Sequence, residues 1–150
     1  MTQTSYSYYH TIKGHYIFVS AGKKHIQKVV QFESTVNENI INIGFGDLLE
    51  DGSIDDTIKS NNGDMIRVLA TVIEILKDYT GRHPDKEILF TGSTRQRTRL
   101  YTRILKTYYR EFKKDFHISA IILSNKTTKR VVFDPIRSAE YVAFLIRRND

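Results

Sequence analysis

The chain has 150 residues, with 40% hydrophobic and 27% charged side chains, a composition that is typical of folded globular proteins and excludes a disordered one. The absence of cysteine excludes a disulfide scaffold, a zinc ribbon and a cysteine nucleophile. The length suits a single domain over 1–150, and the short apolar runs predict a cytoplasmic protein with no secretory signal and no membrane partner.

Basic and acidic side chains are concentrated in different segments, and the net charge is +6. Residues 95–114 hold eight basic side chains against one acidic one, a net +7, whereas 47–64 hold six acidic side chains against one lysine, a net −5. The basic segment could attract phosphate, RNA or an acidic protein. The alternative is a helix whose charged face is simply solvated.

The first half of the chain is predicted to form strands. Residues 1–14 are expected to be a loose arm or an edge strand. Apolar alternation then predicts strands over 16–20, 24–33, 40–49 and 54–58. The turn at 50–53 joins the last two as a hairpin. Lys28 interrupts an apolar face, which predicts an edge or partly exposed strand.

Two amphipathic helices follow, over Met65–Tyr79 and Thr94–Lys113, because apolar residues recur there at spacings of three and four. A short strand at 87–91 lies between them. Further strands are predicted over 117–123, 129–133 and 141–146. The expected core residues are Leu69, Val72, Ile73, Leu76, Phe90, Leu100, Ile104 and Leu105.

These elements predict an α+β domain with a mainly antiparallel sheet and two core helices. The predicted order is β-β-β-β-α-β-α-β-β-β.

Two predicted loops, 60–64 and 91–99, each lead from a strand end to a helix start. Free N–H groups and arginine forks at such a place suit phosphate. The predicted ligand-binding residues are Asn61, Asn62 and Asp64 in the first loop and Ser93, Thr94, Arg97 and Arg99 in the second. We expect them to line one pocket. Helix capping and solvation are the alternative roles for both loops.

The outer stripe of the second helix is the predicted surface for a protein partner. Its members are Arg103, Lys106 and Arg110. The five histidines show no metal-ligand spacing, so no metal site is predicted. Zinc-protease, serine-hydrolase and P-loop motifs are absent, and the residues leave open whether the protein is an enzyme.

Several runs resemble a family of small bacterial proteins classed as a domain of unknown function. They are Ile43-Gly44-Phe45-Gly46-Asp47, Ser60-Asn61-Asn62-Gly63-Asp64 with Val68-Leu69-Ala70-Thr71-Val72, Gly92-Ser93-Thr94 with Arg97-Thr98-Arg99-Leu100-Tyr101, and 141–148. The resemblance covers nearly the whole chain and brings no activity with it.

The element order also resembles, more distantly, the GNAT acyltransferases. That resemblance implies acetyl-CoA as cofactor, with its pyrophosphate in the loop at 60–65, which lacks the family's arginine or glutamine and its second glycine. It also implies that Tyr101 is a catalytic general acid. Tyr101 equally fits the inward face of its helix, where it would only pack.

Three functions follow as hypotheses. The first is a basic module that recognises phosphate in RNA or a nucleotide; the toxin of a bacterial toxin–antitoxin pair, with an antitoxin-type protein partner, is one such protein. The second is a GNAT-like acyltransferase that uses acetyl-CoA on an amine substrate. The third is a non-catalytic protein-interaction module. The charge of 95–114 favours the first.

Overall fold

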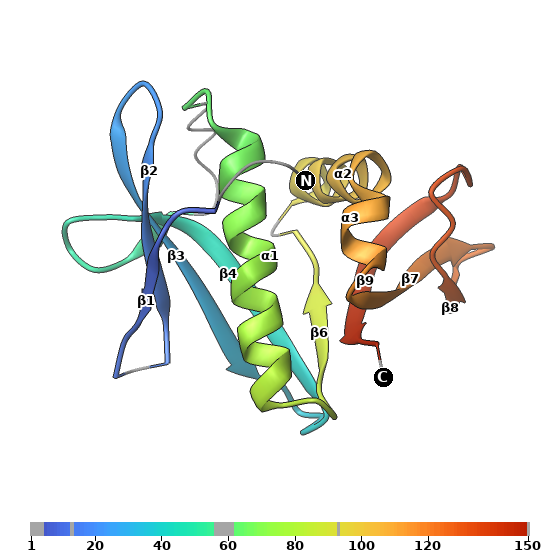
Figure 1. Cartoon of the computed structure of the whole chain (residues 1–150). Coiled ribbons are helices and arrows are strands. Elements are labelled where there is room, and N and C mark those ends of the chain that lie inside the picture. The colour runs from blue at the N-terminus through green and yellow to red at the C-terminus, as the bar shows by residue number, and fades with distance from the viewer. Residues whose placement is uncertain (1–4, 13, 56–61, 93, 150) are drawn as a thin grey trace. The chain divides into compact units, whose positions relative to one another are not determined.

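The computed structural model describes residues 5–12, 14–55, 62–92 and 94–149. Together these residues form nine strands and three helices, in the order β-β-β-β-β-α-β-α-α-β-β-β (Figure 1). The fold is α+β with a mixed, mostly antiparallel sheet, which confirms the predicted class. None of the helices in this part of the chain is long and apolar enough to cross a membrane.

The chain divides into two compact units. We name them the N-terminal unit, 1–33 with 42–79, and the C-terminal unit, 34–41 with 80–150. That the whole chain acts as one domain stays a prediction.

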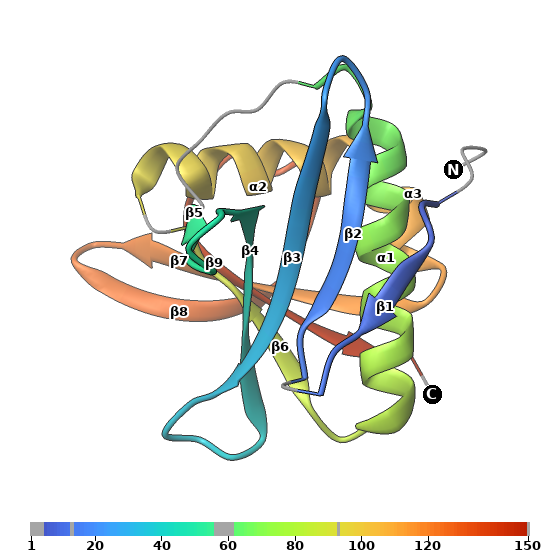
Figure 2. The same cartoon turned by 90° about the vertical axis from the view of Figure 1, so that its left-hand side faces the viewer.

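The sheet of the N-terminal unit begins with an edge strand. Its strands, in order of hydrogen bonding, are β1 (Tyr8–His10), β2 (Tyr16–Ala21), β3 (His25–Ser34) and β4 (Ile40–Leu48), with β5 (Ile54–Asp55) paired to β4. β1 and β2 pair antiparallel, as do β2 and β3, which lie side by side in Figure 2. The N-terminal segment therefore contains an edge strand, one of its two predicted states. Of the predicted strand at 54–58, residues 56–58 lie outside the described part.

Helix α1 (Met65–Arg82) covers one face of these strands (Figure 2). Its four predicted core residues are all buried: Leu69, Val72, Ile73 and Leu76. The Tyr16 hydroxyl donates to Asp78 Oδ2 at 2.8 Å, which fixes β2 to the helix. The helix runs through Gly81 and ends two residues before Pro84, because a residue that precedes proline is disfavoured in the α conformation.

The prediction for Lys28 was wrong. β3 lies between β2 and β4 and is not an edge strand, and Lys28 is only 6% exposed. Its Nζ forms an ion pair with the buried Asp47 of β4. A buried charge needs a partner and hydrogen bonds, and the partner lies on a different strand.

The C-terminal unit places its last strand inside its sheet. The elements are β6 (Glu87–Phe90), α2 (Arg95–Thr107), α3 (Tyr109–Lys113), β7 (Phe116–Ser124), β8 (Thr127–Val132) and β9 (Glu140–Arg148). Hydrogen bonding orders the strands β6-β9-β7-β8, all antiparallel. Helix α2 contacts β9, and α3 contacts β7.

The single helix predicted over Thr94–Lys113 is in fact two. The break is at Tyr108, whose φ of −108° and ψ of 25° are not helical. Threonine and tyrosine, which occupy 107–109, have weak helix propensity, so little opposes the break.

In this part of the chain, fewer of the predicted core residues are buried than expected. Leu105 is buried, whereas Phe90, Leu100 and Ile104 are half-buried.

Candidate functional site

The loop before α2 is shaped by a glycine. A Cβ added to Gly92 would lie 2.4 Å from the Thr98 backbone nitrogen, so no larger residue fits without a shift. The Gly92 N–H donates to Thr98 Oγ1 at 3.2 Å. Thr94 then caps the helix, since its Oγ1 accepts a hydrogen bond from the Arg97 N–H at 3.2 Å. Of the predicted ligand residues in this loop, Ser93 lies outside the described residues.

The two predicted arginines of this loop differ in environment. Arg99 is exposed. Arg97 is half-buried, with its guanidinium 5.6 Å from the centre of the Tyr101 ring. The Arg97 Nε is buried and has no hydrogen-bond partner in the described part of the chain. Arg97 therefore keeps an unused N–H donor near the start of α2.

Tyr101, predicted as a catalytic acid or a packing residue, makes packing contacts. Its ring lies edge-on to Phe90, with the ring centres 6.2 Å apart, and it also contacts the Arg97 guanidinium. A catalytic role for Tyr101 stays a prediction.

In the other predicted loop, Asn62 holds the turn between β2 and β3. Its Nδ2 donates to Ser20 Oγ at 3.0 Å and to the Lys24 carbonyl at 2.7 Å, and its Oδ1 accepts from the Lys24 N–H at 2.8 Å. A Cβ on Gly22 would lie 1.7 Å from the Asn62 carbonyl oxygen, so the approach requires glycine. The side-chain amide of Asn62 thus forms its hydrogen bonds within the protein.

The Asp64 carboxylate also forms hydrogen bonds within the protein. Its Oδ2 accepts hydrogen bonds from the hydroxyls of Tyr6 and Ser20, both at 2.6 Å. Burial, reinforced by the bond to Asp64, raises the pKa of Tyr6 above its ordinary value. The Asp64 carbonyl accepts the Val68 N–H, the first helical bond of α1, at 3.0 Å. These contacts fasten β2 and the N-terminal segment to the start of α1.

The predicted seven-residue pocket draws on both units. Asn62 and Asp64 belong to the N-terminal unit, and Thr94, Arg97 and Arg99 belong to the C-terminal unit. Asn61, like Ser93, lies outside the described residues. That all seven line one pocket stays a prediction.

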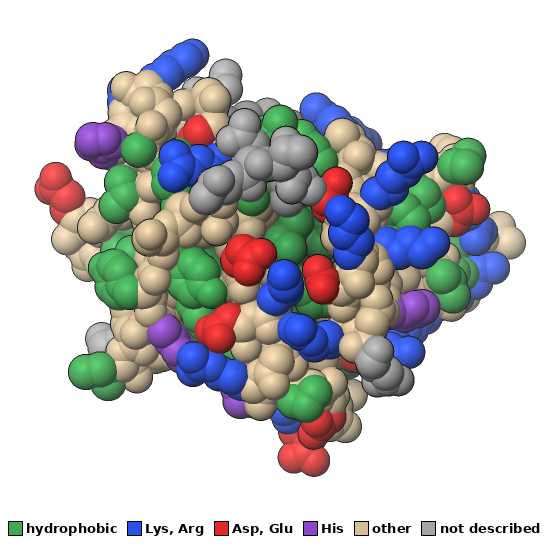
Figure 3. All heavy atoms as spheres, viewed as in Figure 1, with side chains coloured by type: hydrophobic (Ala, Val, Ile, Leu, Met, Phe, Trp, Pro, Cys, Tyr) green, Lys and Arg blue, Asp and Glu red, His purple; other side chains and the backbone are tan. Residues whose placement is uncertain are grey.

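A row of cations runs along α2 and α3, and none of them pairs with a carboxylate among the described residues. We call it the basic face; its members are Arg99, Arg103, Lys106, Arg110 and Lys113. Figure 3 shows lysine and arginine side chains gathered over these helices.

Nearby carboxylates in the C-terminal unit are used by other cations. Glu140 pairs with Arg95 at 3.0 Å, Glu111 pairs with Lys114 at 3.3 Å, and Glu87 pairs with Arg130. Within the described ranges, none pairs with a member of the basic face. The three predicted partner-binding residues all belong to this face.

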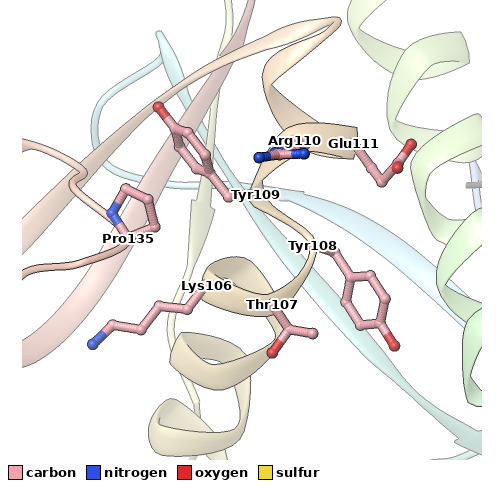
Figure 4. Close-up of a pocket in the computed structure, with 7 residues that line it drawn as sticks. All are labelled: Lys106, Thr107, Tyr108, Tyr109, Arg110, Glu111 and Pro135. Carbon is pink, nitrogen blue, oxygen red and sulfur yellow. The ribbon is translucent and has the colours of Figure 1, made fainter.

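A pocket of about 260 Å³ lies at the corner between α2 and α3 (Figure 4). It is lined by Lys106, Thr107, Tyr108, Tyr109, Arg110, Glu111 and Pro135. The pocket thus brings two tyrosines to the middle of the basic face.

Aromatic rings beneath the corner hold it in place. The ring of Tyr109 is 5.9 Å from Phe133, and Phe133 is 5.7 Å from Tyr141. The Lys106 ammonium lies 5.4 Å from the Tyr141 ring centre, and the Lys113 ammonium lies 5.7 Å from that of Tyr109. Burial raises the pKa of Tyr141 above its ordinary value.

Sequence reasoning found the cations of the pocket but missed Tyr108, Tyr109 and Pro135. The signal that could have found the tyrosines is the adjacent pair itself, since two neighbouring aromatic residues cannot both occupy the inward face of one helix. Across the residues that the structure describes, no group of three or more His, Asp or Glu is placed to hold a metal ion.

Comparison with known proteins identifies the family. The family model described as "Family of unknown function (DUF6934)" matches residues 2–149, so the chain belongs to this family. No curated protein matches the chain. No solved structure matches it either.

Proposed function

We propose that this member of DUF6934 is a phosphate-recognising protein that binds RNA through its basic face. The observation that carries the proposal is the row of five cations on α2 and α3 without a carboxylate partner among the described residues. Such cations attract RNA because each phosphate that they neutralise releases condensed counterions. Three of the five are arginines, whose planar forks match pairs of phosphate oxygens.

The start of α2 supports the same ligand. The first N–H groups of α2 carry partial positive charge at the Arg99 end of the basic face. An RNA backbone that follows the basic face toward Arg99 would therefore reach this partial charge.

The test is binding of a fluorescein-labelled, 12-nucleotide single-stranded RNA, followed by fluorescence anisotropy at several salt concentrations. Five phosphate contacts predict a slope of log K against log salt of about −3.5, since each contact in a single strand contributes about −0.7. The variant R99A/R103A/R110A should bind at least about tenfold more weakly and reduce the slope to about −1.4.

The matched control is K24A/K126A/K129A. It removes three exposed cations that lie outside the basic face, so the change in net charge is the same. Its slope should stay near that of the unaltered protein. Equal loss in the two variants would show that binding follows net charge alone, and no RNA binding at low salt would overturn the proposal.

Two further outcomes separate the alternatives. The narrower hypothesis of a toxin predicts that expression arrests bacterial growth and that R99A/R103A/R110A relieves the arrest. The acyltransferase hypothesis predicts that acetyl-CoA raises the melting temperature and that RNA does not.

A further inference from the structure

The corner between α2 and α3 exists because the helix is interrupted at one residue. Tyr108 leaves the helical conformation, and α3 restarts at Tyr109. The interruption leaves a pocket of about 260 Å³ between the corner and the loop that carries Pro135. A continuous helix would carry its side chains in one regular spiral and would form no such recess.

The two tyrosines of the corner point in different directions. Figure 4 shows the rings of Tyr108 and Tyr109 on opposite sides of the corner, with Pro135 on the side of Tyr109. The Tyr109 ring is held by Phe133 at 5.9 Å with an angle of 48° between the planes. Tyr109 and Pro135 therefore offer two flat, apolar surfaces on one side of the pocket.

The charges around this side suit a phosphate. Lys106 and Arg110 line the pocket, and the Lys113 ammonium lies 5.7 Å from the Tyr109 ring centre. Glu111 is the acidic residue of the lining, and its carboxylate is offset by Lys114 at 3.3 Å. The pocket thus combines an aromatic platform with cations, which is the combination that binds a base together with its phosphate.

We propose that this pocket takes one unpaired nucleobase, stacked against Tyr109 and bounded by Pro135, with its phosphate on Lys106 and Arg110. This inference rests on the proposed function and narrows its ligand to single-stranded RNA. A base in a duplex is stacked and paired, so it cannot enter a recess on the protein without leaving the helix. A free nucleotide has the same chemistry, and the experiment separates the two sources.

The experiment uses the full chain and an eight-nucleotide single-stranded RNA with 2-aminopurine at its centre. The fluorescence of 2-aminopurine changes when it moves from its neighbouring bases onto a tyrosine ring. We expect saturable change with the unaltered protein and with Tyr109→Phe, which keeps the ring. Tyr109→Leu should lose the change and bind about tenfold to a hundredfold more weakly, the range for one stacked base. The control is Tyr9→Leu, at a 57% exposed tyrosine of β1 that does not line the pocket, and it should keep the change.

Two competitors complete the experiment. A duplex of the same sequence should compete about tenfold more weakly than unlabelled single strand. Adenosine monophosphate that abolishes the fluorescence change at micromolar concentration would assign the pocket to a free nucleotide and overturn the assignment to RNA.

The failure of this inference is distinct from the failure of the proposed function. If RNA binds with a salt slope near −3.5 but its 2-aminopurine fluorescence is unchanged, the basic face binds RNA and the pocket takes no base. The same conclusion follows if Tyr109→Leu, shown to be folded by circular dichroism, behaves like Tyr109→Phe. If no RNA binds at all, the proposed function itself is wrong.

Discussion

Removal of the Lys28 ammonium should strongly destabilise the N-terminal unit. Lys28 is 6% exposed, and its partner Asp47 is 7% exposed. The cross-strand neighbour of Asp47 in the β4–β5 pair is Asp55, so two acidic residues lie opposite each other in the register. Lys28→Met keeps the aliphatic volume but leaves Asp47 buried without its ion-pair partner and next to a like charge.

The expected loss in the free energy of unfolding is about 3–5 kcal/mol, the range for one member of a buried pair removed alone. With a urea m-value of about 2 kcal/mol/M, the unfolding midpoint should fall by about 2 M. The double variant Lys28→Met, Asp47→Leu removes both charges and should recover most of the loss, because apolar pairs of similar volume replace buried ion pairs at little cost.

The assay is urea unfolding followed by circular dichroism, with Lys24→Met as control. Lys24 is an exposed lysine in the turn between β2 and β3. Its replacement should change the free energy of unfolding by less than about 0.5 kcal/mol. A Lys28→Met variant within about 0.5 kcal/mol of the unaltered protein would refute the reasoning. It would mean that the ammonium is hydrated or that Asp47 finds another donor.

Three further predictions concern packing and ionisation. Leu76→Ala should lower the free energy of unfolding by about 2–5 kcal/mol, because Leu76 is fully buried, whereas Val132→Ala at a 67% exposed position should cost less than about 0.5 kcal/mol in the same urea assay. Gly92→Ala should cost about 1–3 kcal/mol, because its Cβ would lie 2.4 Å from a backbone nitrogen of α2; Gly44→Ala, with no neighbour nearer than 4.0 Å, is the control, and equal melting temperatures would contradict this account. The pKa of Tyr6 is raised by burial and by its bond to a carboxylate, so its contribution is fully present below the unfolded pKa of about 10 and is lost as the pH rises through the folded value. Unfolding free energies measured from pH 9 to 11 should therefore fall less steeply in Tyr6→Phe, and parallel curves would show that Tyr6 ionises as freely in the folded state as in the unfolded one.

The helices could be predicted from the sequence where the residues that define them lie close together in the chain. The residues that form the buried face of α1, from Leu69 to Leu76, recur with the helical period, so the same residues define the element and its inward side. Thr94 was also predictable as a cap, because its partner, the Arg97 N–H, lies three residues away. The part of the basic face that lies on α2, namely Arg99, Arg103 and Lys106, follows from the same period.

The candidate pocket could be predicted only in part. Lys106 and Arg110 belong to the helical pattern, but the break at Tyr108 separates the two helices and turns Tyr109 toward Pro135, 26 positions further along the chain. A periodic sequence pattern cannot predict that Tyr109 and Pro135 lie close together, since their contact depends on how the loop after β8 packs over the corner.

By itself, the sequence determined the class of the fold, the position of nearly every helix and strand and the concentration of positive charge on α2 and α3, because these depend on neighbours within a few residues. The tertiary structure alone decided that β9 lies between β6 and β7 and that Lys28 is buried against Asp47, 19 positions away. Strand order and charge pairing are set by contacts between distant segments. The cost of closing such loops and burying such charges is balanced only when the whole sheet is assembled.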